Sequence, residues 1–175
     1  MSDRRSYVES FLECMAPGET ASHCFQVIHD RDKAAAAAIL HGSFEQHHAE
    51  LEAYSARGYG IFWTVNRTNG CGRAKTDITA VRAVWLDIDE PGRDIAPIEA
   101  AMPPHAVVES SPGKLHVYWR VADCTLEEFN PLLDALTERW QGDKGAKGIN
   151  RVMRLPGFPH QKAEPFVTRV LRWLP

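Results

Sequence analysis

The sequence predicts an α+β fold with mixed helices and strands and at least one antiparallel pair of strands. Apolar residues recur at helical spacing in residues 3–15. Short apolar runs of strand length lie at residues 23–28, 59–65 and 81–89. Two further runs, 106–111 and 114–121, are separated only by a Pro-Gly pair, which is typical of a hairpin. An α+β fold is therefore favoured over a doubly wound parallel sheet.

The length and composition suit one soluble domain. The chain has 175 residues and a net charge of −3, which allows a substantial core. No apolar run approaches the roughly 18 residues that a membrane span needs. The first residues, MSDRRSYVES, lack the apolar core of a secretory signal. We therefore expect a cytoplasmic protein with no membrane partner.

The four cysteines give no support for a metal centre. No pair of them has CxxC spacing, and they are scattered along the chain. We therefore expect reduced thiols rather than zinc ligands or a disulfide framework.

Each element of the first half has a local signal. Residues 3–15 place apolar side chains on one side of a helix. Asp32 can cap a helix that runs through the alanine-rich segment to Leu40. Residues 43–57 predict a further helix, which Gly58 would end. After the strand at 59–65, the polar, glycine-bearing segment NRTNGCGRAKTD predicts a loop before the strand at 81–89.

The second half also contains helix and strand signals. Thr125 and Glu128 have the spacing of a capping box, so we expect a helix from there to residue 140. Pro131 falls six residues past that cap, so either a kink or a later helix start is expected. Arg151 and Arg154 are three apart on an expected helical turn, so they would share a face. Residues 165–174 predict the last strand.

Two aspartates stand at the end of the strand VWLDIDE. Residues i and i+2 of a strand point to the same face, so the carboxylates of Asp87 and Asp89 project together. Two such charges repel unless a cation lies between them, and oxygen ligands at this spacing suit Mg²⁺ or Mn²⁺. The alternative is an exposed strand end before the turn EPG, since a bare DxD is short and common.

The hairpin SSPGKLHVYWR carries a second group of polar residues. His116 lies where a strand paired near the aspartates could meet a phosphate, and Ser111 and the backbone of Gly113 could donate to phosphate oxygens. The alternative is a structural histidine, because histidines in strands are commonly partly buried.

The segment 142–162, GDKGAKGINRVMRLPGFPHQK, is strongly basic. Residues 1–140 carry 13 Lys and Arg against 21 Asp and Glu, whereas residues 141–175 carry 7 against 2. Asp143 could complete a three-carboxylate metal site, and arginine and lysine suit triphosphate recognition. The alternatives are a flexible basic loop without a site, or a merely solvated tail.

Taken together and in order, these stretches resemble the archaeo-eukaryotic primase superfamily, most closely its primase-polymerase branch in plasmids and phages. That branch has an hhhDhD motif, an SxGxxHhYW-type strand, and an acidic residue leading into RhhRLPGxxxxK. Here these are VWLDID, SPGKLHVYW, and Asp143 with RVMRLPGFPHQK. The segment FWTVNRTNGCGR is also similar to an asparagine-bearing segment of the branch. The resemblance covers roughly residues 59–162.

The resemblance implies a role for each matched residue. The acids Asp87, Asp89 and Asp143 would hold two Mg²⁺ or Mn²⁺ ions, although Asp134 or Asp123 could take the third place. The remaining matched residues are His116 with Ser111 and Gly113 near the phosphates of the incoming nucleotide, Arg151, Arg154 and Lys162 as phosphate or template contacts, and Asn66 lining the nucleotide pocket.

The resemblance also implies a fold and an activity. The fold is a single two-lobed catalytic domain, residues 1–175, with an N-terminal α/β lobe to about residue 80. A lobe like an RNA-recognition motif follows, and the active site lies in the cleft. The activity is a DNA primase-polymerase that uses dNTPs or NTPs on a single-stranded DNA template. A replicative helicase or a C-terminal helical domain is an expected partner, because some relatives carry one.

Two other functions stay open at this point. A non-catalytic module could hold single-stranded nucleic acid by stacking bases on Tyr118 and Trp119. A metal-dependent nuclease could use the same carboxylates.

Overall fold

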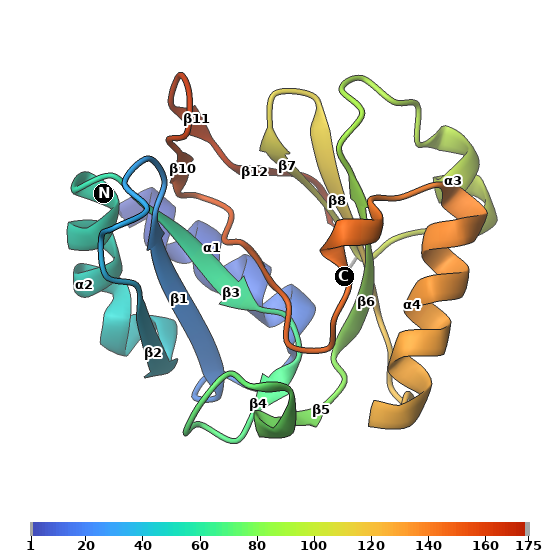
Figure 1. Ribbon diagram of the computed structural model, residues 1–175, viewed down its shortest axis with the longest axis horizontal. Coiled ribbons are helices and arrows are strands. Elements are labelled where there is room, and N and C mark those ends of the chain that lie inside the picture. Colours follow the sequence, from blue (N-terminus) through green and yellow to red (C-terminus); the bar gives the residue numbers. More distant parts are fainter. Residues whose placement is uncertain (1, 174–175) are drawn as a thin grey trace.

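The computed structural model describes residues 2–173, with side chains from Arg4 onward. Two four-stranded antiparallel sheets lie side by side, each flanked by helices (Figure 1). The first sheet has the order β2-β1-β3-β9 and the second the order β12-β7-β8-β6. This arrangement confirms the predicted α+β class.

The first half of the chain builds most of the first sheet. Its elements are α1 (Ser2–Met15), β1 (His23–His29), β2 (Ala38–Gly42), α2 (Phe44–Ala56), β3 (Tyr59–Thr64), β4 (Arg67–Thr68), η1 (Lys75–Asp77) and β5 (Ile78–Ala80).

The second half builds the second sheet and returns once to the first. Its elements are β6 (Ala83–Ile88), α3 (Ala96–Ala101), β7 (Ala106–Ser111), β8 (Lys114–Arg120), α4 (Leu126–Trp140), η2 (Lys144–Ala146), β9 (Val152–Arg154), β10 (Pro159–His160), β11 (Phe166–Val167) and β12 (Arg169–Trp173). The predicted hairpin is confirmed as β7 and β8. Strand β9 pairs with β3, so the two sheets are not two unbroken segments of the chain.

The helix predicted from Asp32 to Leu40 is wrong. The Asp32 carboxylate accepts a bond from the Ala34 backbone N–H at 2.9 Å in a local turn, and residues 38–42 form β2. Leu40 pairs with Phe25 of β1. The alanines favour a helix but provide no large apolar face to bury, so pairing with β1 decides the conformation.

Helix α4 starts where its capping box predicts. The Thr125 hydroxyl accepts from the Glu128 N–H, and the Glu128 carboxylate accepts from the Thr125 N–H at 2.9 Å. The later start considered for Pro131 is therefore wrong, since the helix runs through it. Phe129, Leu133 and Leu136 bury the inner face of α4, and α4 packs against β6. This burial offsets the cost of the missing proline N–H.

Two other sequence predictions need correction near the C-terminus. Residues 152–154 form β9, so the helical face predicted to be shared by Arg151 and Arg154 is wrong. The strand predicted at residues 165–174 is divided into β11 and β12, with Thr168 between them. Its last residue, Leu174, lies outside the described residues.

Helix α1 joins the two sheets. The ring of Phe11 packs edge-on against Trp63 of β3 at a centroid distance of 5.8 Å and against Tyr118 of β8 at 6.2 Å. All three side chains are buried. Since buried aromatic side chains dominate core energetics, this contact fixes one sheet relative to the other. Within the described residues, no helix is both long and apolar enough to cross a bilayer.

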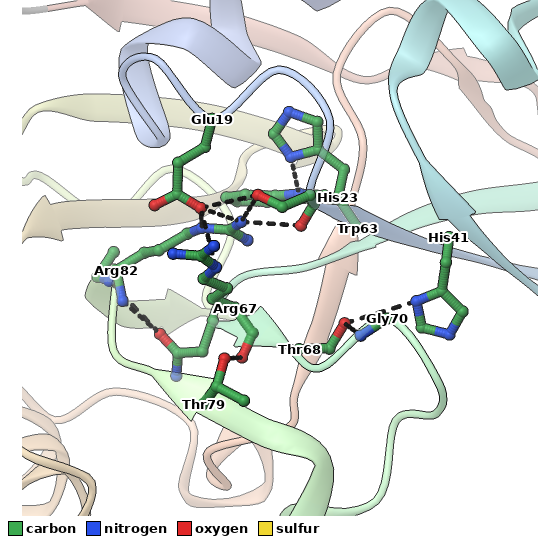
Figure 2. Close-up of polar contacts among 12 residues, drawn as sticks. Glu19, His23, His41, Trp63, Arg67, Thr68, Gly70, Thr79 and Arg82 are labelled. Atoms are coloured by element: carbon green, nitrogen blue, oxygen red, sulfur yellow. Dashed lines mark hydrogen bonds and ion pairs between the residues drawn. The ribbon is translucent and has the colours of Figure 1, made fainter.

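A buried polar network also connects the sheets (Figure 2). The Arg82 guanidinium, just before β6, pairs with the Glu19 carboxylate at 2.6 Å. The Asn66 carbonyl oxygen accepts from the Arg82 backbone N–H at 3.0 Å, and its amide nitrogen donates to the Ile149 carbonyl at 2.9 Å. Asn66 is fully buried. It therefore fastens the end of β3 to the start of β6 and to the segment before β9.

We predict that Asn66→Ala destabilises the protein by about 2–3 kcal/mol, because it leaves buried backbone groups without partners. Urea unfolding would measure this loss. The matched control is Asn69→Ala, which removes an exposed amide with similar local bonds. Equal losses for the two variants would contradict the role of Asn66.

Candidate active site

The candidate site lies at the edge of the second sheet, where β6 ends. Among the described strands, β6 pairs only with β8, and Asp87 lies opposite His116 in their register. Trp85 anchors β6, since its indole N–H donates to the Ala146 carbonyl at 2.9 Å and its ring packs on Phe129. The strand end is thus held firmly beside α4 and η2.

The two aspartates differ in environment. The Asp87 side chain is 13% exposed, whereas that of Asp89 is 58% exposed. Asp89 accepts an ion-pair bond from the Lys114 ammonium at 2.9 Å. One carboxylate is therefore buried at the sheet edge, and the other stands in solvent beside a cation.

The end of α4 brings a third carboxyl group to this edge. Gln141 adopts a left-handed conformation with φ 51° and ends the helix. A Cβ on Gly142 would lie 2.3 Å from the Leu86 Cδ1 atom, so only glycine permits this approach to β6. The Asp143 N–H then donates to the Asp87 carbonyl at 2.7 Å.

The structure distinguishes Asp143 from its alternatives for the third acidic position. Its carboxylate accepts from the Gly145 N–H at 2.9 Å, at the start of η2, and its charge acts on Asp87. Asp134 instead pairs with Lys147 on the exposed side of α4, and Asp123 is exposed before that helix.

The surroundings of the Asp87 carboxyl group disfavour its charged form. Burial raises its pKa from 3.8 to about 7, and the negative charges of Asp89 and Asp143 add to the shift. Arg151 and Lys114 act in the opposite direction. The folded protein therefore resists ionisation of Asp87 below neutral pH.

His116 is buried and neutral. It is 6% exposed, and burial, followed by the charge of Arg154, lowers its pKa to about 3. Its Nδ1 atom lies 3.2 Å from the Tyr118 hydroxyl, and its Nε2 atom lies 3.7 Å from the Asp87 carboxylate. At neutral pH the imidazole has no charge, and 3.7 Å is too long for a hydrogen bond, so this pair is not an ion pair.

The three carboxylates do not form a ready-made ligand set. Among the described side chains, no group of three or more His, Cys, Asp or Glu is arranged to hold a metal ion. Asp89 is turned to Lys114 and Asp143 to the Gly145 N–H. The donors nonetheless suit a hard divalent cation, because they are carboxylates whose mutual repulsion a cation would relieve.

The three predicted basic contacts divide into two kinds. Arg154 is buried in an ion pair with Asp30 at 2.6 Å, with side-chain exposures of 8% and 2%. In the part of the chain that the structure describes, Arg151 and Lys162 form no ion pair. The charge of Arg151 acts on both Asp87 and His116, which places it at the site.

The hairpin residues lie close to the site with specific local partners. Ser111 ends β7 opposite Lys114. The Gly113 N–H already donates to the Glu109 carboxylate at 2.9 Å, so a phosphate would have to displace that bond. Asn66 is buried beside the start of β6, at the opposite end of that strand from Asp87, and both ends of its amide are bonded to backbone groups.

Sequence reasoning missed His160 and Asp30. A ring nitrogen of His160, Nδ1, lies 3.1 Å from the Ser110 carbonyl, and the buried Nε2 has no hydrogen-bond partner among the described residues. His160 could have been singled out, because it lies in the motif segment PHQK. Asp30 is 124 residues from Arg154, and no local pattern indicates their pairing.

The stacking surface proposed for a non-catalytic binding module is contradicted. Tyr118 has no exposed surface, and Trp119 is 4% exposed with its indole N–H donating to the Met102 carbonyl. Neither ring can stack on a base, because both belong to the core.

The chain matches a known family over most of its length. Residues 62–170 match the RepB DNA-primase N-terminal domain. No curated protein matches the chain.

Solved structures share the fold at low sequence identity. The AEP domain of the cyanophage S-2L primase-polymerase superposes with a TM-score of 0.83 at 19% identity, covering 97% of this chain and 90% of that one. The primase RepB′ gives 0.77 at 18% identity, covering 97% of this chain and 56% of its own. The catalytic domain of RepB′ in complex with initiator DNA gives 0.71 at 18% identity, covering 97% and 85%. At these identities the likeness establishes the fold alone.

We predict that the Asp87 carboxyl group contributes stability to the metal-free protein at low pH, and that this contribution falls as pH rises from about 4 to about 8. The raised pKa of Asp87 means that the folded state keeps a proton that the unfolded chain loses near pH 3.8. The contribution of Asp87 to stability is complete below pH 3.8 and is lost as pH rises through about 7. Asp87→Asn should remove at most about 4 kcal/mol of this dependence.

Urea unfolding in EDTA at several pH values would measure the effect. Asp134→Asn, which changes an exposed carboxylate, should keep the wild-type pH profile. A profile for Asp87→Asn that runs parallel to the wild type would contradict the buried, charge-repelled carboxyl group.

Proposed function

The chain belongs to the RepB DNA-primase N-terminal domain family, and we propose that it catalyses template-directed nucleotidyl transfer on single-stranded DNA. In this reaction a primer 3′-hydroxyl oxygen attacks the α-phosphorus of an incoming nucleotide, and pyrophosphate leaves. The observation that carries the proposal is that the charges of Asp89, Asp143 and Arg151 all act on the buried Asp87 carboxyl group, and that Arg151 forms no ion pair among the described residues. Acids for a metal and a cation for a triphosphate are what this chemistry requires.

Asp87, Asp89 and Asp143 would hold the divalent ions. When bound, Mg²⁺ or Mn²⁺ would acidify the 3′-hydroxyl and neutralise charge on the triphosphate. The protein contributes position: β6 fixes Asp87, Lys114 holds Asp89 just past the end of β6, and Gly142 brings Asp143 to the same edge. The raised pKa of Asp87 supports this role, since a carboxylate that resists ionisation alone gains most from a nearby cation.

Arg151 and Lys162 would meet the triphosphate. Neither is engaged in an ion pair in the described part of the chain, so each can offer its charge to a phosphate oxygen. His116 would act as a neutral donor. If its Nδ1 accepts from the Tyr118 hydroxyl, its proton lies on Nε2 and can be donated to a phosphate oxygen. Ser111 lies at the neighbouring hairpin and is a further candidate donor.

The template would be single-stranded DNA, and the substrates dNTPs or NTPs. Support comes from the similar RepB′ catalytic domain, which was solved in complex with initiator DNA. The chain spans 56% of the RepB′ primase chain. A helicase or a C-terminal helical domain is a further proposed partner.

We predict that Asp143→Asn lowers primer extension at least about 100-fold, because it removes one ligand from the carboxylate set. Extension of a labelled primer on a single-stranded template, with dNTPs and Mg²⁺ or Mn²⁺, would measure the rate. The matched control is Asp134→Asn, which removes the same charge from the exposed side of α4 and should leave the rate within about twofold.

The products formed by the wild type and the two variants separate the possible outcomes of this experiment. Pyrophosphate release with growing product supports nucleotidyl transfer, and a lane without primer decides whether the chain also initiates. Template cleavage without extension would point to the nuclease. An equal loss of primer extension in Asp143→Asn and Asp134→Asn would contradict the assignment of Asp143 to the site.

A further inference from the structure

The loop at residues 160–163, which carries Lys162, is fixed by the end of β1. The Arg31 Nε donates to the Gln161 carbonyl at 2.7 Å, and its Nη2 donates to the Ala163 carbonyl at 2.7 Å. These two carbonyls stand on either side of Lys162 in the chain. One planar guanidinium therefore fixes the backbone before and after the lysine.

Asp30 fixes the same loop from the adjacent position. Its carboxylate accepts from the Gln161 N–H at 2.6 Å and from the Arg154 guanidinium at 2.6 and 3.2 Å. Its side chain is only 2% exposed. The Asp30 carboxylate thus connects the loop to β9, and it does so in a buried position where an unpaired charge would be costly.

The surroundings leave Arg154 little freedom. Its guanidinium stacks on the Phe62 ring at 4.7 Å. A Cβ on Gly60 would lie 2.6 Å from the Arg154 Nη1 atom and 2.8 Å from the Asp30 Oδ1 atom, so the pair occupies the space that a side chain would need. The charge of Arg154 is compensated by Asp30, whereas Lys162 is exposed and forms no ion pair in the described part of the chain.

The second sheet holds the other side of the loop. A ring nitrogen of His160 lies 3.1 Å from the Ser110 carbonyl of β7. On the side of the first sheet, the Gln161 side-chain amide donates to the Ser55 carbonyl of α2 at 2.9 Å. Bonds from both sheets therefore converge on residues 160–163. Such a density of bonds is unusual for an exposed surface loop and requires a reason.

We propose that Asp30 and Arg31 are positioning residues that hold this loop so that Lys162 meets the phosphates of the incoming nucleotide, and that Arg154 belongs to the same support. The inference rests on the proposed function and deepens it. Arg154 then acts through Asp30 on the loop and does not neutralise phosphate itself. Lys162 and Arg151 supply the positive charge, and Asp30 and Arg31, just after β1, hold the loop in position.

A double-mutant cycle on nucleotide binding tests the proposal. Arg31→Ala, Lys162→Ala and the double variant are compared for the dissociation constant of a fluorescent dATP analogue, and for KM and kcat in primer extension. We expect Arg31→Ala to weaken binding and raise KM about fivefold with kcat within twofold, and the double variant to match Lys162→Ala alone. A purely structural arginine would not show this coupling to Lys162.

Arg57→Ala is the matched control. Arg57 is also exposed, and its Nε atom donates to the Ala53 carbonyl, but it contacts no residue of the loop. It should bind nucleotide as the wild type does. Should Arg31→Ala be poorly folded, Arg31→Lys keeps the charge but lacks the planar fork for both carbonyls, and it should show the same coupling.

Two results would overturn the proposal. One is wild-type nucleotide binding in Arg31→Ala. The other is that Arg31→Ala weakens nucleotide binding by the same factor in the Lys162→Ala background as in the wild-type protein. Because the binding measurement needs no catalysis, it can succeed or fail independently of primer extension. Absent extension with coupled binding would contradict the proposed function and leave the positioning role supported.

Discussion

The cost of burying the Asp87 carboxylate is the constraint on which the site depends. A charged group at the edge of a sheet loses hydration, and two further carboxylates beside it increase the penalty. Protonation relieves both the burial cost and the repulsion at low pH, and a bound cation would relieve both when the carboxyl group is ionised. The surrounding residues fit that requirement: Gly142 lets Asp143 approach, Lys114 pairs with Asp89, and Arg151 forms no ion pair with any residue that the structure describes.

The two sheets matter because the site draws on both. The acids come from the end of β6 and from the segment after α4, against the second sheet, while the loop with Lys162 is bonded to Arg31, just after β1 of the first sheet. Phe11 and Asn66 fix the sheets to one another through apolar and polar contacts respectively. In the proposed function, a nucleotide between the acids and the basic groups would meet two surfaces whose relative position is set by the core.

Sequence patterns predicted the features that depend on neighbouring residues. The Pro-Gly pair predicted the β7–β8 hairpin, and Thr125 with Glu128 predicted the start of α4. The predictions failed where contacts with distant segments of the chain determine the conformation. Residues 38–42, at the end of the predicted alanine-rich helix, form β2 because they pair with β1. Residues 152–154 form β9 instead of a helical turn because they pair with β3. Asp30 could not be found, since its partner is far away in the sequence.

The most direct test of the account is a carbon NMR titration of the Asp87 carboxyl group, assigned by its absence in Asp87→Asn. Without metal, the group should titrate with a pKa near 7, and saturating Mg²⁺ should move the titration well below pH 5. Titration near pH 4 that Mg²⁺ does not change would contradict a buried carboxylate cluster built for a cation.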